Sequence, residues 1–385
     1  MEIKNLEKAA KRIKKAIKNG ENIILYGDAD LDGVSSVIIL KEAIKDLGGK
    51  ISAVYFPDRE NEGYGITKTG LMTLKHFSPA LFIVMDLGIG NFKEVKIAKK
   101  LGFEVIIIDH HEILNKLPSA SIVVDPKQKG DKYPFKFLAA TGISFKLSQI
   151  LLGKRLTKNL RDNFLELVAL ATIADMMPQV EENRIFIDEG LESLGRTFRP
   201  GLKAFFSTED GNLLSLKEMS QKIISSLNAS DKIDHLNEIY LLLTEKDERA
   251  AEELARKLLE KGAERRIRIR EIVEEVEEKV EERLEEKIIF EGSVHWPLIL
   301  LGAVASRICQ RYQKPTFLFK IGELESPGAV RVPSGLDSVK LMGKCSKFLE
   351  TYGGHPAASG FRIKNKNLEK FKKCLIANYE RIKNE

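Results

Sequence analysis

Several features are scarce or missing in this chain, and each absence narrows the class of protein. Its 385 residues contain three cysteines, Cys309, Cys345 and Cys374, which show no paired spacing. We therefore expect reduced thiols and a cytoplasmic protein. Apolar runs long enough to span a bilayer are missing, and the N-terminal segment is charged and amphipathic rather than a signal peptide. The sequence thus predicts no membrane association.

Charged side chains, in contrast, are plentiful. They make up 31% of the residues against 43% apolar ones, and the formal net charge is +6. The excess of positive charge is uneven, because residues 1–20 carry seven Lys and Arg against two Glu. A basic excess fits a polyanionic partner, although solvated helix faces explain it equally well.

Strand and helix patterns alternate through the first part of the chain. Apolar runs predict strands at 22–26, 51–56, 81–85 and 104–108, and amphipathic segments predict helices at 4–18, 34–47 and 91–101. Such alternation predicts an α/β fold with a parallel sheet and helices on both faces. Residues 136–200 are mostly helical in pattern.

A long charged helix is predicted over 243–287. It carries one narrow apolar stripe, made of Ile269, Val273, Val276, Val280 and Leu284. The favoured interpretation is an amphipathic helix packed on one neighbour, and a coiled-coil dimer is the alternative. We expect three parts: an α/β domain at 1–200, a helical region with this connector at 201–287, and a smaller α/β domain at 288–385.

Metal-binding side chains follow three of the predicted strands. Asp109, His110 and His111 come directly after 105–108, and Asp86 follows 81–85. The loop after 22–26 supplies Asp28, Asp30 and Asp32. Because ligand sites in parallel sheets gather at the carboxyl ends of strands, we expect one site that holds two divalent metal ions.

The acidic loop is open to two interpretations. If it is extended, alternate side chains point the same way, so Asp28, Asp30 and Asp32 would all face one cavity, and Gly33 would allow a tight turn into a helix. The spacing also matches the start of an EF-hand calcium loop. The second half of the EF-hand pattern does not match, since its twelfth position is Ile39 rather than Glu.

The other acidic residues also have simpler explanations. Asp86 and Asp109 can be helix N-caps, a common role for Asp after a strand. Asp175 ends the apolar helical segment that starts at Phe164, which is the unfavourable end of the helix dipole for a carboxylate. A bound cation would offset this, and a solvated C-terminal Asp is the alternative.

Together these blocks resemble the DHH phosphoesterase superfamily, and in particular its RecJ-type single-strand exonucleases. Segments 26–33, 84–88, 109–111 and 167–178 resemble the four motifs of the superfamily. The RecJ branch is indicated by 57–59, 62–65, 125–126, 133–135 and 138–142, and the DHH-associated domain by 295–296, 305–307 and 353–360.

The resemblance implies a role for each matching residue. Metal ligation would fall to Asp30, Asp32, Asp86, His110 and Asp175, with Asp86 bridging two ions. His111, beside Asp109, would contact the scissile phosphate or protonate the leaving oxygen. The expected substrate contacts are Arg59, Tyr64, Lys232, Ser306, Arg307, Arg331, Gly353, Gly354 and His355.

The chain departs from the family pattern at three positions. Tyr26 stands where the family has a His ligand, so either one metal loses a ligand or Asp28 substitutes. Ala329 replaces a Ser that precedes the family's Arg. Lys232 replaces an Arg, which keeps the charge and loses the bidentate fork.

The resemblance implies a metal-dependent 5′→3′ exonuclease that acts on single-stranded DNA, with RNA as an alternative, and releases 5′-mononucleotides. It implies two divalent ions, with Mn²⁺ favoured over Mg²⁺, no OB-type domain, and replication or repair proteins as partners. Two alternatives remain open: a phosphoesterase for small substrates such as oligoribonucleotides, phosphoadenosine phosphate or cyclic dinucleotides, and a non-catalytic replication scaffold.

Overall fold

The computed structural model describes residues 2–113, 116–207 and 214–383. It divides into two compact units, Met1–Gly262 and Ala263–Glu385, called unit 1 and unit 2 below. The expected helical region at 201–287 is therefore split between the units, and its residues 208–213 lie outside the described part. A search of the described helices finds none that combines the length and the apolar character needed to cross a bilayer.

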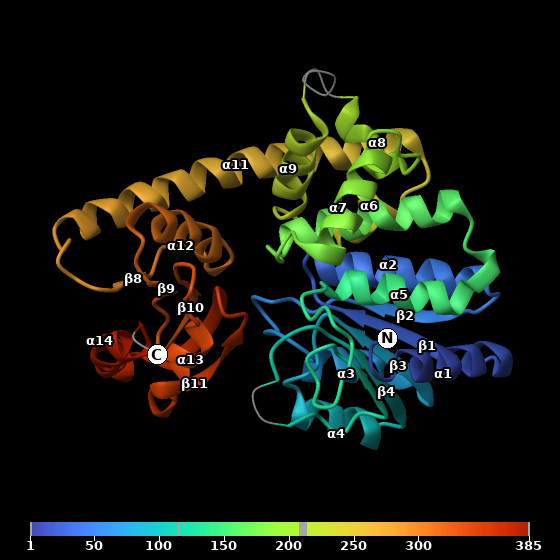
Figure 1. Cartoon of the computed structure of the whole chain (residues 1–385), viewed down its shortest axis with the longest axis horizontal. Helices are drawn as coiled ribbons and strands as arrows, with labels where there is room; N and C mark the ends of the chain where they lie inside the picture. The colour runs from blue at the N-terminus through green and yellow to red at the C-terminus, as the bar shows by residue number, and fades with distance from the viewer. Residues whose placement is uncertain (1, 114–115, 208–213, 384–385) are drawn as a thin grey trace. The chain divides into compact units, whose positions relative to one another are not determined.

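Unit 1 is built on a parallel five-stranded sheet, as the sequence predicts, in the order β2-β1-β3-β4-β5 (Figure 1). Side chains along each strand alternate between two apolar cores. In β1, Ile23 and Leu25 belong to one core and Ile24 and Tyr26 to the other. The strands are β1 (Asn22–Gly27), β2 (Ile51–Tyr55), β3 (Ala80–Met85), β4 (Phe103–Ile108) and β5 (Ile122–Val124).

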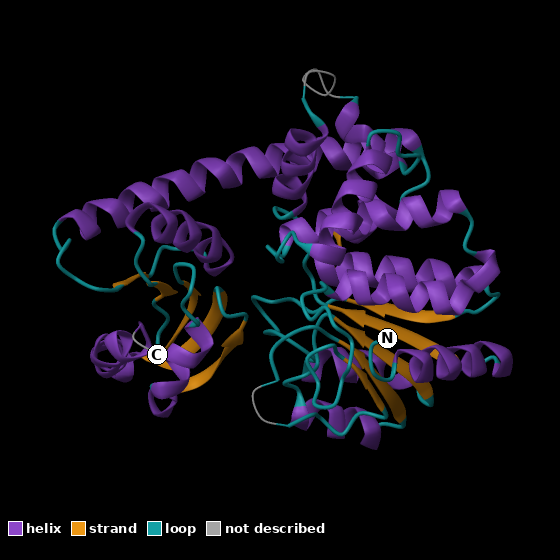
Figure 2. Ribbon diagram, viewed as in Figure 1, coloured by secondary structure: helices purple, strands orange, loops and turns teal. Residues whose placement is uncertain are grey.

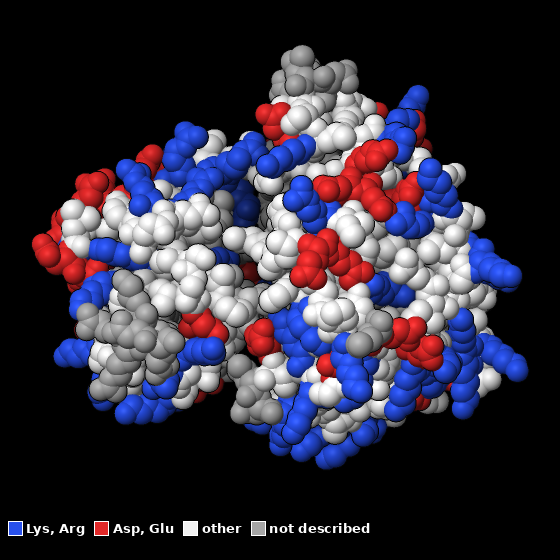
Figure 3. All heavy atoms as spheres, viewed as in Figure 1, with Lys and Arg blue, Asp and Glu red and all other residues white. Residues whose placement is uncertain are grey.

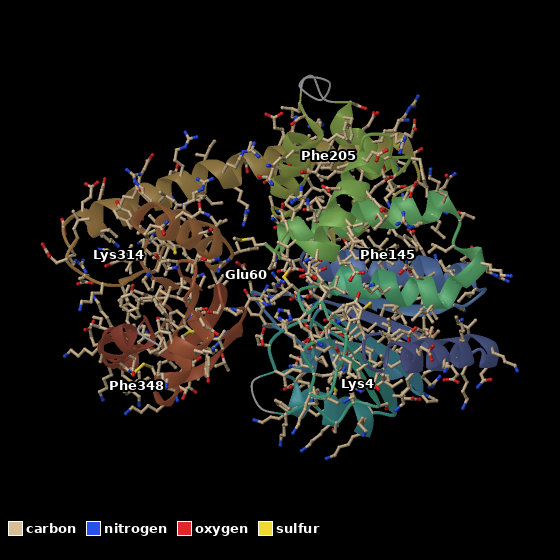
Figure 4. All side chains as sticks on the ribbon, viewed as in Figure 1. Lys4, Glu60, Phe145, Phe205, Lys314 and Phe348 are labelled. Atoms are coloured by element: carbon tan, nitrogen blue, oxygen red, sulfur yellow. A yellow bond between two sulfur atoms is a disulfide. The ribbon has the colours of Figure 1, made fainter. Side chains whose placement is uncertain are left out.

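Helices cover both faces of this sheet, as Figure 2 shows. One face carries α1 (Leu6–Asn19), α2 (Leu31–Asp46) and α5 (Ala140–Leu152), and the other carries α3 (Lys68–Leu74) and α4 (Phe92–Lys100). A further helical layer packs on α2 and α5 and buries Phe145 and Phe205 completely (Figure 4). It consists of α6 (Lys158–Ala174), α7 (Glu181–Leu194), α8 (Pro200–Phe206), α9 (Leu216–Leu227) and α10 (Glu238–Thr244), with a short hairpin of β6 (Lys232–Ile233) and β7 (Leu236–Asn237).

Unit 2 is a smaller α/β unit with a mixed sheet in the order β11-β12-β10-β9-β8. Only the β8–β9 pair is parallel among its described strands. The strands are β8 (Ile289–Ser293), β9 (Thr316–Lys320), β10 (Glu325–Arg331), β11 (Leu349–Gly354) and β12 (Ala358–Lys364), and the helices are α12 (Leu298–Tyr312), α13 (Ser338–Lys344) and α14 (Leu368–Lys383).

The long helix α11 runs from Glu248 to Glu281, shorter at both ends than expected. Its apolar stripe does not form a coiled coil. Ile269, Val276 and Val280 are buried in one core with Trp296 and the apolar face of α12. The stripe thus packs within the same chain, as the favoured interpretation expects, but α11 as a whole has more than one neighbour, because Ala251, Ala255 and Leu258 are buried in another core. Leu284 lies beyond the helix end and is exposed.

The expectation of three reduced thiols is wrong for two of them. Cys345 and Cys374 form a disulfide, with their Cα atoms 6.0 Å apart. The packing of α13 against α14 brings the two residues together, although they lie 29 positions apart in sequence. Cys309 is a buried free thiol.

The contact between α6 and α7 depends on Gly190. A Cβ added at Gly190 would lie 2.2 Å from the backbone oxygen of Leu165. We expect Gly190→Ala to lower the free energy of unfolding by about 1–3 kcal/mol in urea denaturation, because the helices must separate to accept the methyl group. Gly90→Ala is the control, since its Cβ would meet nothing within 4 Å. Equal stability of the two variants would contradict this account.

Candidate metal centre

Four aspartates stand in a row at the carboxyl edge of the unit 1 sheet. Each comes directly after a strand, and the strand-final residues are in register as Gly27–Met85, Met85–Ile108 and Ile108–Val124. The ladder extends one residue further, through backbone N–H groups that donate to the neighbouring strand at 2.9–3.2 Å. The row consists of Asp28, Asp86, Asp109 and Asp125.

Besides a group made of Asp86, Asp109 and His111, two groups that contain only the predicted metal ligands form around this row. Asp28, Asp30 and Asp86 make the first, and Asp32, His110 and Asp175 the second. In each group the ligand atoms lie within 4.8 Å of one another.

The two groups are adjacent. His110 Nε2 lies 3.1 Å from Asp86 Oδ1, and 3.6 Å from a carboxylate oxygen of both Asp32 and Asp175. Asp86 therefore reaches the second group while it belongs to the first. All six predicted ligands meet at one place.

The acidic loop does not have the extended conformation that was one of its two interpretations. Helix α2 begins at Leu31, so Asp30 is its N-cap and accepts a hydrogen bond from Gly33 N at 3.0 Å. Asp32 lies in the first helical turn and points into the second ligand group, so the three aspartates do not share one cluster. The helical conformation also excludes an EF-hand loop.

Gly33 is required for close approach rather than for a turn. A Cβ at Gly33 would lie 2.4 Å from the backbone oxygen of Asp28. The glycine thus lets the start of α2 fold directly against the loop that carries the first ligands.

Asp32 rests on the N-terminus of α5. Its carboxylate accepts hydrogen bonds from the backbone N–H groups of Ala140 and Thr141, both at 2.8 Å. The Thr141 hydroxyl also donates to Asp32, and Ser36 Oγ donates to that hydroxyl at 3.3 Å. Ser36 and Thr141 are fully buried. The sequence matched the block 138–142 to a family motif but did not single out Thr141, because its role depends on a tertiary contact.

Asp109 orients His111. Its Oδ1 accepts hydrogen bonds from His111 N at 3.2 Å and lies 2.8 Å from His111 Nδ1, while its Oδ2 accepts one from Ile89 N at 3.0 Å. Burial lowers the pKa of His111, but the Asp109 carboxylate outweighs this and the pKa rises to about 9. His111 therefore carries a proton at neutral pH.

The crowded carboxylates destabilise their own charged forms. Burial, and then the neighbouring aspartates, raise the pKa of Asp86 and of Asp175 well above the usual range. Burial likewise raises the pKa of Asp32 to about 6. A divalent cation would offset this repulsion, and the set of carboxylate oxygens with one imidazole fits Mn²⁺ or Mg²⁺.

Asp125, the fourth member of the row, was not among the predicted site residues. It is fully buried, and burial followed by the charge of Asp109 raises its pKa to about 8. The signal for it was present in the sequence, because Asp125 ends an apolar run in the same manner as the other three.

Arg59, on the loop that follows β2, packs against the acidic loop. Its guanidinium pairs with Asp28 and Asp30 at 2.8 Å each. The exposed Tyr64 ring lies beside it, with the guanidinium carbon 5.3 Å from the ring centroid. Lys232, on β6, forms an ion pair with Glu62 of the loop that carries Arg59. The loop follows β2 and is marked by Glu60 in Figure 4.

Tyr26, at the position where the resemblance implies a histidine, is part of the apolar core that also contains Tyr55 and Phe82. It is fully buried, stacks on Tyr55 with ring centroids 5.2 Å apart, and accepts a hydrogen bond from Thr67 N at 3.1 Å. Of the two possibilities raised by the sequence, the geometry favours Asp28 as the substitute ligand, since Asp28 belongs to the first group.

The predicted substrate contacts of unit 2 gather around β10 and β12. Arg331 pairs with Ala358, whose backbone hydrogen-bonds with that of His355. Gly353 and Gly354 pair with Gly360 and Ser359. On α12, Gly302 lies against the Arg331 guanidinium, and Ser306 and Arg307 follow about one helical turn later.

Charge is divided along α11, as Figure 3 shows. Lys and Arg gather over its middle, where the sequence carries Arg265, Arg266, Arg268 and Arg270. Asp and Glu gather over its C-terminal part.

The segment that carries most of these ligands matches a known protein family. Residues 22–172 match the DHH family, N-terminal domain. This match confirms, for residues 22–172, the resemblance to the DHH superfamily seen in the sequence.

Similarity to individual proteins extends over nearly the whole chain. The single-stranded-DNA-specific exonuclease RecJ of Bacillus subtilis (strain 168) is 35% identical over 368 residues, which are 94% of this chain and 46% of that protein. A crystal structure of exonuclease RecJ bound to manganese has a TM-score of 0.78 at 26% identity and covers 99% of this chain and 96% of that one.

RecJ from Thermus thermophilus, in complex with Mn²⁺, has a TM-score of 0.82 at 25% identity and covers 99% of this chain and 55% of that one. The chain therefore spans about half the length of the Bacillus and Thermus proteins.

The hydrogen bond from Thr141 to Asp32 gives a testable prediction. We expect Thr141→Val to weaken Mn²⁺ binding about tenfold or more in isothermal titration calorimetry, because groups that orient a ligand contribute this much to metal affinity. Thr141→Ser keeps the hydroxyl and should retain the affinity.

Ser144→Ala is the matched control for this prediction. Ser144 lies on the same helix and is fully buried, and its hydroxyl makes no hydrogen bond among the described residues. If Thr141→Val binds Mn²⁺ with unchanged affinity, the Thr141 hydroxyl does not position Asp32 for the metal.

Proposed function

We propose that the chain is a metal-dependent exonuclease of the RecJ type that degrades single-stranded DNA from the 5′ end and releases 5′-mononucleotides. The observation that carries this proposal is the pair of adjacent ligand groups that meet at Asp86 and His110. Two ions held side by side are the arrangement that hydrolyses phosphodiesters in many nucleases. The RecJ relatives, named as exonucleases specific for single-stranded DNA, support the choice of substrate.

The six predicted ligands would hold the metal ions in the proposed reaction. When bound, two divalent cations at these groups would supply a hydroxide at neutral pH and neutralise charge on the phosphate. Asp86 would bridge the two positions, with Asp28 and Asp30 on one side and Asp32, His110 and Asp175 on the other. Mn²⁺ is favoured because the donor set contains an imidazole, and Mg²⁺ is the alternative.

His111 is suited to the leaving group. Asp109 fixes the His111 ring and raises its pKa, so the imidazole can donate a proton to the 3′-oxygen as the bond between phosphorus and that oxygen breaks. Arg59 and Lys232 would hold neighbouring phosphates. Because such contacts release counterions, substrate binding should weaken as salt rises.

The function is tested by digestion in Mn²⁺. The substrates are single strands about thirty nucleotides long, labelled at the 5′ or the 3′ end, as DNA and as RNA, beside a dinucleotide. We expect immediate release of labelled mononucleotide from 5′-labelled DNA and no cleavage without a divalent ion. Cleavage of the dinucleotide alone would assign the chain to small substrates, and no metal-dependent cleavage would leave the scaffold interpretation.

Asp86 provides the variant that tests the two-ion arrangement. Asp86 has a positive φ of 63°, a conformation that Asn tolerates well, so Asp86→Asn should fold normally. We expect it to lose hydrolysis by about a thousandfold or more, since both ion positions lose a ligand. The control Asp188→Asn changes an exposed aspartate on α7 and should keep the rate. Activity retained in Asp86→Asn would contradict the two-ion arrangement.

A further inference from the structure

Two large apolar side chains are exposed beside the second ligand group. Phe137 is 48% exposed and Met176 is 58% exposed. Met176 directly follows the ligand Asp175, and Phe137 lies three residues before Ala140, whose backbone N–H binds Asp32. An apolar rim next to a group of acidic ligands is not explained by phosphate binding, which requires cations or amide donors.

One buried amide joins the two segments. The side chain of Asn183 is fully buried, and its Nδ2 donates to the backbone oxygens of Phe137 at 2.6 Å and of Pro178 at 3.0 Å. The Phe137 ring also packs edge-on against the buried Phe135, with centroids 5.9 Å apart. These contacts tie the segment of Phe137 to the segment that follows Asp175, while the side chains of Phe137 and Met176 stay exposed.

The backbone at Met176 is unusual as well. Its φ is 56°, in the left-handed region that a non-glycine residue seldom adopts. The hydrogen bonds Met176 N to Ile173 O and Met177 N to Thr172 O, both 3.1 Å, end α6 in this conformation. As a result Met177 is buried and Met176 is presented to solvent.

We infer that Phe137 and Met176 form an apolar platform that receives a nucleobase of the strand whose phosphate lies at the ligand groups. This inference rests on the proposed function. A base is the only large apolar part of a nucleotide, and it is attached within one sugar of the phosphate. Stacking on such a platform tolerates every base, so it adds affinity without sequence preference.

The test compares an ordinary strand with one that lacks bases. Both are 5′-phosphorylated single strands about twelve nucleotides long, and the second carries abasic tetrahydrofuran residues at its first two positions. For the unsubstituted protein in Mn²⁺, we expect KM to be about fivefold or more lower for the ordinary strand. In the double variant Phe137→Ala with Met176→Ala, KM for the ordinary strand should rise to the abasic value, while KM for the abasic strand stays unchanged.

The matched control is Phe198→Ala. Phe198 is 61% exposed in the same unit and lies beyond the far end of the 14-residue helix α7. Its replacement should leave both KM values unchanged.

The outcomes separate the two proposals. The unsubstituted protein must first hydrolyse both strands. If the double variant then raises both KM values equally, or changes neither of them, the platform is refuted and the exonuclease proposal stands. If the unsubstituted protein hydrolyses neither strand, the exonuclease proposal fails and the platform with it.

Discussion

Electrostatic repulsion among buried carboxylates is the constraint around which unit 1 is arranged. The strand register places an aspartate after each of four neighbouring strands. Three further ligand aspartates join them, Asp30 and Asp32 from the start of α2 and Asp175 from the end of α6. Such a group is stable only where positive charge and hydrogen-bond donors surround it. The structure supplies these from several directions: Arg59 from the loop after β2, the imidazole of His111, and the N-terminus of α5 beneath Asp32.

The fold provides each of these counter-charges through ordinary secondary structure. Parallel strands make every carboxyl end face the same edge, so ligands from distant parts of the sequence meet without any long loop. Helix α5 packs beside α2, which brings its free N–H groups to Asp32. Helix α6 ends with its C-cap at Asp175, an unfavourable position for a carboxylate alone and a favourable one beside a cation.

Much of this could be read from the sequence, because apolar runs followed by acidic residues report directly on strand ends. The parallel sheet and the strand-end ligands Asp28, Asp86 and His110 lie where that pattern places them. The orientation of Asp32 could not be predicted, since it depends on α2 starting at Leu31 rather than after Gly33. Thr141 and the Cys345–Cys374 disulfide were missed because each joins elements that meet only in the folded chain. The strands of unit 2 after β9 were also missed, since glycine and proline interrupt their apolar pattern.

The position of Arg59 links the two kinds of ligand that the proposed enzyme must bind. Its guanidinium occupies Asp28 and Asp30, the same carboxylates that would hold the first cation. A cation held by Asp28 and Asp30 would therefore compete with the ion pairs of Arg59 and would favour its release. The released guanidinium can then turn to a phosphate, so the strand would bind more tightly once the metal is present. By thermodynamic reciprocity the strand would in turn hold the metal more tightly, which makes assembly of the active complex cooperative.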